Sequence, residues 1–179
     1  MILKEATHVQ EVGKIIETDP VRKHIVPALR LKNGARVFYY GEPDNLIAAI
    51  CMHTSRIVPD SEEQLLTEYH WGGASKGGSK AIFYSVWSHQ KGMGRQILNT
   101  ALAQLVIENK HERYITLSPK TEMAKKFHTS NGAKLIHESL WAYNFEYFIR
   151  HGNEDEQMGP IKFRSQRRCT CRVSTSTRE

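Results

Sequence analysis

A strand that passes directly into a glycine-containing helix start is the feature that most constrains how this chain folds. The segment "AIFYSVWSHQKGMGRQIL", residues 81–98, opens with apolar and aromatic residues typical of a buried strand. Gly92 and Gly94 follow, and the apolar residues from Ile97 to Val106 then recur at helical spacing. This order of strand, short junction and helix indicates a domain in which helices pack on a sheet.

The junction has the chemistry of an anion-binding site. Glycine lets the backbone approach a ligand closely, and the free N–H groups of a helix N-terminus point outward at its positive end. We therefore expect Lys91, Gly92, Met93, Gly94 and Arg95 to bind a pyrophosphate, with an ordinary helix cap as the alternative. The spacing fits neither a Rossmann fingerprint nor a P-loop, because a third glycine and a Gly-Lys-Ser/Thr sequence are both missing.

Hydrophobic spacing and turn residues divide the rest of the chain into further helices and strands. Asp19-Pro20 should end the first helix, Pro119 should lie near the start of the last helix, and Gly132 should end it. The order predicts an α/β (α+β) domain with a mixed sheet over residues 1–150. Its predicted segments are a helix over 1–18, a short helix or irregular segment over 19–31, strands over 35–40 and 46–54, a polar surface loop over 55–79, a strand over 113–118, a helix over 120–128 and closing strands over 133–139 and 140–149.

Residues 151–179 show no periodicity, and we expect a basic, disordered tail there. The net charge of +6 comes partly from residues 161–172, which contain no acidic residue, and it favours an anionic partner such as nucleic acid or a polyphosphate-bearing cofactor. A lone Cys-x-Cys at 169–171 lacks the further ligands of a zinc site, so no metal is expected. No apolar run approaches the roughly 20 residues that span a bilayer, and Lys4 and Glu5 interrupt the N-terminal apolar stretch. We expect a cytoplasmic protein without a membrane partner.

The glycine junction resembles the pyrophosphate loop of the GNAT acyltransferase superfamily, which reads Gln/Arg-x-x-Gly-x-Gly/Ala. Here residues 89–94 read "HQKGMG", so that His89 replaces the usual Gln or Arg. In "MAKKFHTSNGAKLI", His128 stands where that family often has the tyrosine that protonates the departing CoA thiolate. The resemblance covers about residues 35–149. It implies a GNAT-like fold, a mixed, mostly antiparallel and twisted sheet flanked by helices, and an acyl-CoA substrate held by the pyrophosphate loop and Val86.

A narrower resemblance concerns the segments "AIFYSVWSHQKG", "ITLSPKTEM", "KFHTSNGA" and "YNFEYF", which are similar to the catalytic domain of malonyl-CoA decarboxylase, itself a GNAT-like fold. It implies that Ser85 and His128 occupy the positions of a catalytic serine and histidine. The sequence lacks a counterpart of that enzyme's N-terminal helical domain, and its loop after "SHQKG" is shorter. The alternatives are a helix-end histidine that interacts with the helix dipole and a small buried serine bonded to the backbone. An unperturbed histidine titrates at about pH 6.5 and can act as an acid or a base.

Three functions follow as hypotheses. The first is an N-acyltransferase that moves an acyl group, above all acetyl, from CoA to an amine acceptor that the sequence does not identify. The second is decarboxylation of malonyl-CoA at the same site, with Ser85 orienting the carboxylate and His128 protonating the enolate. The third is a nucleic-acid-binding or nucleic-acid-modifying protein that contacts phosphates through residues 161–172 and the loop "GGASKGGSK".

Overall fold

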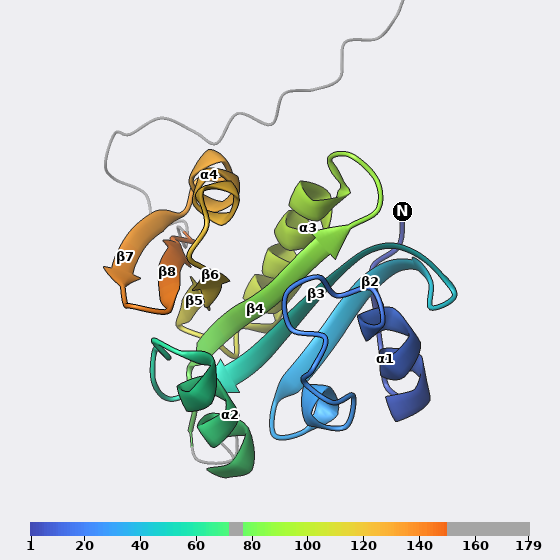
Figure 1. Ribbon diagram of the computed structural model, residues 1–179, viewed down its shortest axis with the longest axis horizontal. Helices are drawn as coiled ribbons and strands as arrows, with labels where there is room; N and C mark the ends of the chain where they lie inside the picture. The colour runs from blue at the N-terminus through green and yellow to red at the C-terminus, as the bar shows by residue number, and fades with distance from the viewer. Residues whose placement is uncertain (72–76, 150–179) are drawn as a thin grey trace, which may run out of the picture. The chain divides into compact units, whose positions relative to one another are not determined.

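A mixed sheet of eight strands forms the centre of the computed structural model, which describes residues 1–71 and 77–149. The strand order is β1-β2-β3-β4-β5-β8-β6, and β7 pairs with β8 (Figure 1). Only β4 and β5 run parallel, which confirms the predicted mixed, mostly antiparallel sheet. The predicted tail over 151–179 lies outside the described residues. The strands are β1 (Lys4–Glu5), β2 (Ala35–Glu42), β3 (Asn45–Ser55), β4 (Lys80–Ser88), β5 (Arg113–Thr116), β6 (Ser118–Pro119), β7 (Lys134–Glu138) and β8 (Ala142–Tyr147); the helices are α1 (Val9–Ile16), α2 (Glu62–Trp71), α3 (Met93–Glu108) and α4 (Glu122–Ser130).

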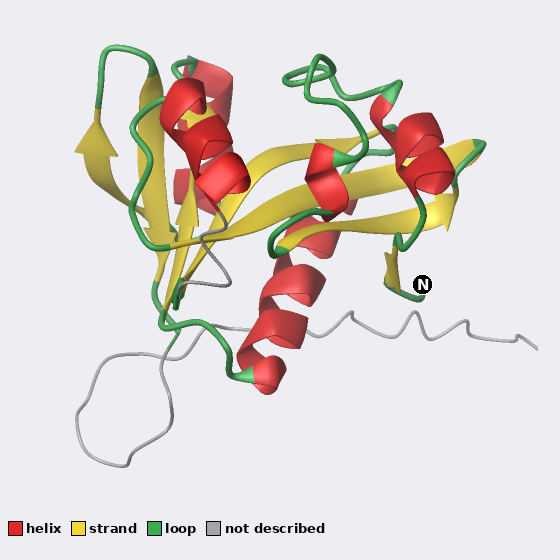
Figure 2. Cartoon of the chain, turned by 90° about the horizontal axis from the view of Figure 1, so that it is seen from below, coloured by secondary structure: helices red, strands yellow, loops and turns green. Residues whose placement is uncertain are grey.

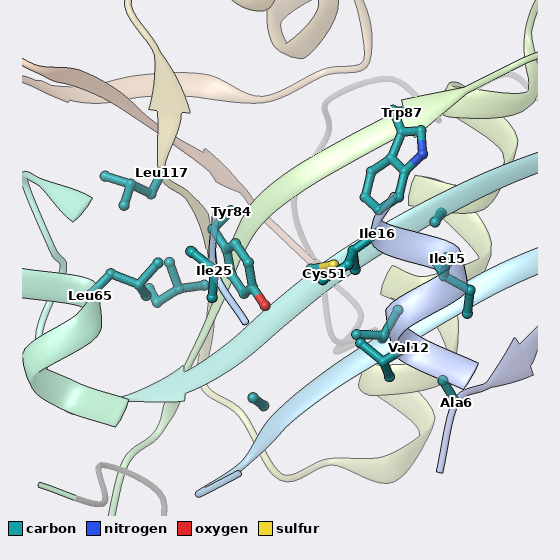
Figure 3. Packing of buried hydrophobic residues seen from close by; sticks show 14 of the residues in the cluster. Ala6, Val12, Ile15, Ile16, Ile25, Cys51, Leu65, Tyr84, Trp87 and Leu117 are labelled. Carbon is teal, nitrogen blue, oxygen red and sulfur yellow. The ribbon is translucent and has the colours of Figure 1, made fainter. Parts of the chain in front are cut away.

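Helices cover both faces of the sheet, with α1 and α3 on opposite sides (Figure 2). On one face α1 buries Val12, Ile15 and Ile16 in a cluster that also contains Tyr84 of β4 and Leu65 of α2 (Figure 3). On the other face α3 buries the apolar stripe that the sequence predicted, formed by Ile97, Leu98, Ala101, Leu102 and Leu105. Two separate apolar layers therefore hold β4 between them, which fixes the strand that leads into the glycine junction.

The predicted surface loop over 55–79 is wrong for residues 62–71, which form α2. Ser61 caps this helix, since its Oγ accepts the N–H of Gln64 at 3.2 Å, and the Gln64 side chain in turn accepts the N–H of Asp60 at 3.1 Å. This is close to a capping box, a signal that is visible in the sequence as Ser-x-x-Gln. Leu65 is fully buried and anchors the helix to the core, which outweighs the polar composition of the segment.

Two other predicted boundaries also change. The first helix is shorter than predicted and is limited to Val9–Ile16, because β1 precedes it. The segment over 19–31, predicted as a short helix or an irregular segment, consists of turns and a 3-10 helix at Leu29–Leu31. Pro119 lies near the start of the last helix, as predicted, but the helix begins at Glu122 and not at residue 120. Pro119 of β6 pairs with Ala142 of β8, and Thr121 caps α4 by accepting the N–H of Ala124 at 3.2 Å. Pairing with β8 therefore extends the chain for two residues before the helix can begin.

None of the helices in the described part of the chain combines the length and the apolar character that crossing a bilayer requires. The same part of the chain contains no group of three or more His, Cys, Asp or Glu side chains arranged to hold a metal ion.

Candidate functional site

The parallel strands β4 and β5 separate halfway along β4, and a pocket lies between them. They pair from Lys80 to Phe83, and the N–H of Leu117 donates to the carbonyl of Phe83 at 2.8 Å as the last contact. Beyond it the two strands diverge in Figure 1. The pocket has a cavity volume of about 310 Å³. Its walls come from β4, the segment after β5, α3, α4 and the chain just after α1, and they include Pro20, Val21, Ser85, Val86, Ser88, Gly94, Leu98, Leu117, Phe127 and His128.

The far half of β4 offers unpaired backbone groups to this pocket. The N–H of His89 donates to the carbonyl of Ile47 at 2.9 Å, and the register pairs Trp87 with Ala49. Because hydrogen-bonded and non-hydrogen-bonded pairs alternate in an antiparallel ladder, Val86 and Ser88 turn their N–H and C=O groups away from β3. Among the described strands none pairs with that side of β4 beyond Phe83, so these groups face the pocket.

A β-bulge precedes this open stretch. Met52 pairs with Phe83, but the next β3 residue, Cys51, pairs with Ser85, so Tyr84 is the extra residue on β4. A bulge places two consecutive side chains toward one face and increases the local twist. Here it lies at the point where β4 leaves β5.

The glycine junction closes one end of the pocket. Gly92 is the N-cap of α3 with φ at +84°, a left-handed conformation that glycine adopts without strain. A Cβ on Gly94 would lie 3.4 Å from the Ser88 Oγ and 3.7 Å from the Phe127 ring, so an added methyl group would contact both β4 and α4. Lys91 and Arg95 are exposed on either side. The first turn of α3 therefore combines helix N–H groups with two exposed cations.

His128 reaches the same pocket from the last turn of α4. The helix ends in a Schellman arrangement: the N–H of Ala133 donates to the carbonyl of His128 at 3.1 Å, and the N–H of Gly132 donates to that of Thr129 at 3.0 Å. Gly132 has φ at +87°, so the left-handed residue expected from the sequence is confirmed. This cap fixes the backbone of His128. The His128 ring stacks on the ring of Phe145 in β8, with 5.1 Å between the two ring centroids.

The His128 imidazole is neutral at ordinary pH. It is 5 % exposed, and burial lowers its pKa to about 4. Its Nδ1 lies 2.7 Å from the hydroxyl of Tyr147, whose own pKa burial raises. The protonated phenol has no other partner among the described residues, so we assign it as the donor to Nδ1, which leaves the ring proton on Nε2. The pKa of His128 therefore lies well below the ordinary value of an imidazole, because β8 and α4 enclose the ring.

Ser85 supplies a second polar atom. The residue is 4 % exposed, and its Oγ has no hydrogen-bond partner among the residues that the structure describes. A buried hydroxyl without a partner costs about 1–3 kcal/mol. A ligand in the pocket that brought a polar group to Ser85 would recover that cost.

The structure brings together Ser85, Val86, Gly94 and His128, which all line the pocket. Lys91, Gly92, Met93 and Arg95 do not line it but surround the adjacent first turn of α3. Sequence reasoning did not detect the contact between Tyr147 and His128. The alternation Tyr143-x-Phe145-x-Tyr147, which places these rings on one face of a strand, was the available signal.

A mixed sheet whose two parallel strands splay beside a helix N-terminus is the GNAT acyltransferase fold, and comparison with solved structures agrees. Tetrahymena GCN5 superposes with a TM-score of 0.57 at 11 % identity, over 84 % of this chain and 97 % of that one. The paiA N-acetyltransferase of Thermoplasma acidophilum, solved in complex with coenzyme A, gives 0.54 at 11 % identity over 82 % and 98 %.

Malonyl-CoA decarboxylase from Agrobacterium vitis also matches, with a TM-score of 0.57 and 22 % identity over 70 % of this chain. The matched region is 35 % of the decarboxylase, so this chain corresponds to about a third of its length. At such identities the likeness establishes the fold. No family model matches the sequence, and no curated protein matches it.

Proposed function

We propose that this chain binds a coenzyme A thioester between β4 and β5 and transfers its acyl group, in the first place acetyl, to an amine acceptor. The observation that carries the proposal is the unpaired edge of β4 at Val86 and Ser88, which leads directly to the N-terminus of α3. The amides of a pantetheine arm can pair with such an edge as a strand would. The pyrophosphate then meets the helix N–H groups at Gly92–Gly94, with Lys91 and Arg95 beside it.

The pocket residues provide two contributions to acyl transfer. The acceptor nitrogen attacks the thioester carbon, and the N–H of Val86 stabilises the negative charge that develops on the carbonyl oxygen. The carbon–sulfur bond then breaks, and the Nε2–H of His128 donates a hydrogen bond to the departing sulfur. The proton of the acceptor amine leaves to solvent. Because the pKa of His128 is lowered to about 4, it acts as a neutral donor and not as an imidazolium.

Decarboxylation of malonyl-CoA is the second candidate, and the unpartnered hydroxyl of Ser85 favours it. Ser85 would donate to the malonyl carboxylate and orient it. The carbon–carbon bond breaks, CO₂ leaves, and the electron pair of that bond stays on the thioester fragment as an enolate. The enolate takes a proton from His128, and solvent then reprotonates His128. The likeness to the Agrobacterium vitis decarboxylase supports this alternative.

Thioester analysis by mass spectrometry separates the two reactions. The purified chain is incubated with acetyl-CoA or malonyl-CoA, with and without small amines. His128→Gln is the test variant, and His137→Gln, which changes an exposed histidine on β7, is the matched control. Free CoA that forms from acetyl-CoA only with an amine supports the transferase. Acetyl-CoA that forms from malonyl-CoA without an amine supports the decarboxylase. If neither thioester binds or reacts, the proposal is wrong.

The nucleic-acid hypothesis stays a prediction. It depends on residues 161–172 and on the loop "GGASKGGSK", residues 72–80. All of 161–172 and the part of the loop over 72–76 lie outside the described residues.

A further inference from the structure

The guanidinium of Arg22 lies at the point where β4 and β5 separate. The last backbone contact between these strands joins Leu117 N–H and the Phe83 carbonyl. Directly beyond it, Nη1 of Arg22 donates to the carbonyl of Tyr84, and Nη2 donates to the carbonyl of Leu117 at 3.1 Å. A single side chain from a distant part of the sequence thus binds a carbonyl of β4 and the carbonyl of Leu117, the residue that follows β5.

A buried network holds Arg22 in this position. The side chain of Asp19 accepts the N–H of Arg22 at 3.1 Å and Nη1 of Arg30 at 2.8 Å, and Arg30 in turn donates to the Arg22 carbonyl. The Arg22 Nε lies 3.2 Å from a carboxylate oxygen of Glu62 and forms an ion pair with it. The Nε–H group makes no hydrogen bond to that oxygen. Two cations and two carboxylates balance in this network. Arg22 is 4 % exposed, and both side chains of the Asp19–Arg30 pair are fully buried.

Closing the gap between the strands would require Arg22 to leave this network. Its departure would break the ion pair with Glu62, whose other charged contact is His24, and would leave the guanidinium without the carbonyls and the carboxylate that it contacts, which is costly in a buried site. The guanidinium is planar and rigid, so its two nitrogens also hold the two carbonyls at a set separation. The strands are therefore kept apart before any ligand binds.

We propose that Arg22 is a positioning residue that holds β4 and β5 apart and so presents the backbone of Val86 and Ser88 to the pocket. Asp19 of the same network also accepts the N–H of Val21 at 2.8 Å, and Pro20 and Val21 line the pocket. The strand separation stands independently of any ligand, whereas its consequence for coenzyme A rests on the function proposed above.

Amide hydrogen exchange by NMR tests the separation without any ligand. In the wild-type chain the amides of Val86 and Ser88 should exchange at least about tenfold faster than those of Ser85 and Trp87, which face β3. Equal protection of all four amides overturns the proposal, and this measurement needs no variant.

Variants then test the role of the guanidinium. Arg22→Gln removes the rigid fork, and Arg22→Lys keeps the charge for Glu62 but has one nitrogen for two carbonyls. Lys23→Gln, at the exposed neighbouring position, is the matched control. In both Arg22 variants the Val86 and Ser88 amides should become more protected, and calorimetry should show coenzyme A affinity at least about tenfold lower than in the control.

The outcomes separate the two proposals. A purely structural role would lower the melting temperature of the Arg22 variants but leave exchange and affinity in the folded state unchanged, and this result overturns the positioning role. If the wild-type chain does not bind coenzyme A but the exchange pattern changes as expected, the proposed function fails and the role of Arg22 in strand separation stands. If Arg22→Gln does not fold, Arg22→Lys is compared with the control, beside the wild-type exchange pattern.

Discussion

Acidification should destabilise the folded chain through His128. Above about pH 6.5 the imidazole is neutral in both the folded and the unfolded chain, so it contributes no pH dependence. As the pH falls from about 6.5 toward 4, His128 becomes protonated in the unfolded chain but stays neutral in the folded chain, because burial lowers its pKa to about 4. The free energy of unfolding therefore decreases in this window, and the decrease ends once both states are protonated.

The size of the effect follows from the same pKa. Each pH unit within the window contributes about 1.4 kcal/mol, so the full loss is about 3 kcal/mol and the loss between pH 7 and pH 5 is about 2 kcal/mol. Single domains have a total free energy of unfolding of about 5–15 kcal/mol, so this one residue should visibly shift the unfolding curve.

Urea denaturation followed by tryptophan fluorescence at pH 7 and pH 5 measures this loss. Burial also lowers the pKa of His111, so the decisive quantity is the difference between the wild-type chain and His128→Gln, in which the window at position 128 disappears. The exposed-site variant His137→Gln should behave like wild type. Equal losses in the wild type and in His128→Gln would refute the reasoning that burial keeps this imidazole neutral.

Three further perturbations have expected magnitudes. Asp19→Asn leaves the buried Arg30 without a counter-charge and should cost about 3–5 kcal/mol in urea unfolding, whereas Asp44→Asn, which breaks an exposed pair, should cost at most about 1 kcal/mol. Leu65→Ala should cost about 2–5 kcal/mol, and a smaller loss would mean that α2 is not anchored as described. Gly92→Ala should cost about 1 kcal/mol through its left-handed backbone alone, since no atom lies within 4 Å of the added Cβ; a crystal structure of the variant would show whether the junction keeps its φ.

Local signals made much of the fold and part of the site predictable. The apolar strand over 81–87, the stripe of α3 and the glycine that ends α4 each depend on residues within a few positions of one another. The pairing of Ser85 with His128 in one pocket was reached through the family resemblance, because nothing in the spacing of the two residues specifies it.

The remaining features depend on contacts between distant segments. Arg22 binds carbonyls 62 and 95 residues away, so the sequence around "VRKH" gives no sign of them. The pKa of His128 depends on its enclosure by β8. The residues around a helix-end histidine do not show whether its ring is exposed or covered by a distant strand. Helix α2 is the exception, since its Ser-x-x-Gln cap is local and was outweighed by the polar composition around it.

The chemistry of the pocket wall makes the two proposed reactions differ in their dependence on pH. No Asp, Glu, Lys or Arg lines the described pocket, and His128 is neutral above about pH 4. Amine acylation therefore has no carboxylate base and requires the acceptor to arrive deprotonated. Its kcat/KM should rise about tenfold per pH unit between pH 6 and 9 for an alkylamine, whose pKa is about 10. Decarboxylation needs no base, so its kcat/KM should stay flat over the same range. A plateau in amine acylation below pH 8 would show that a base outside the described pocket takes part.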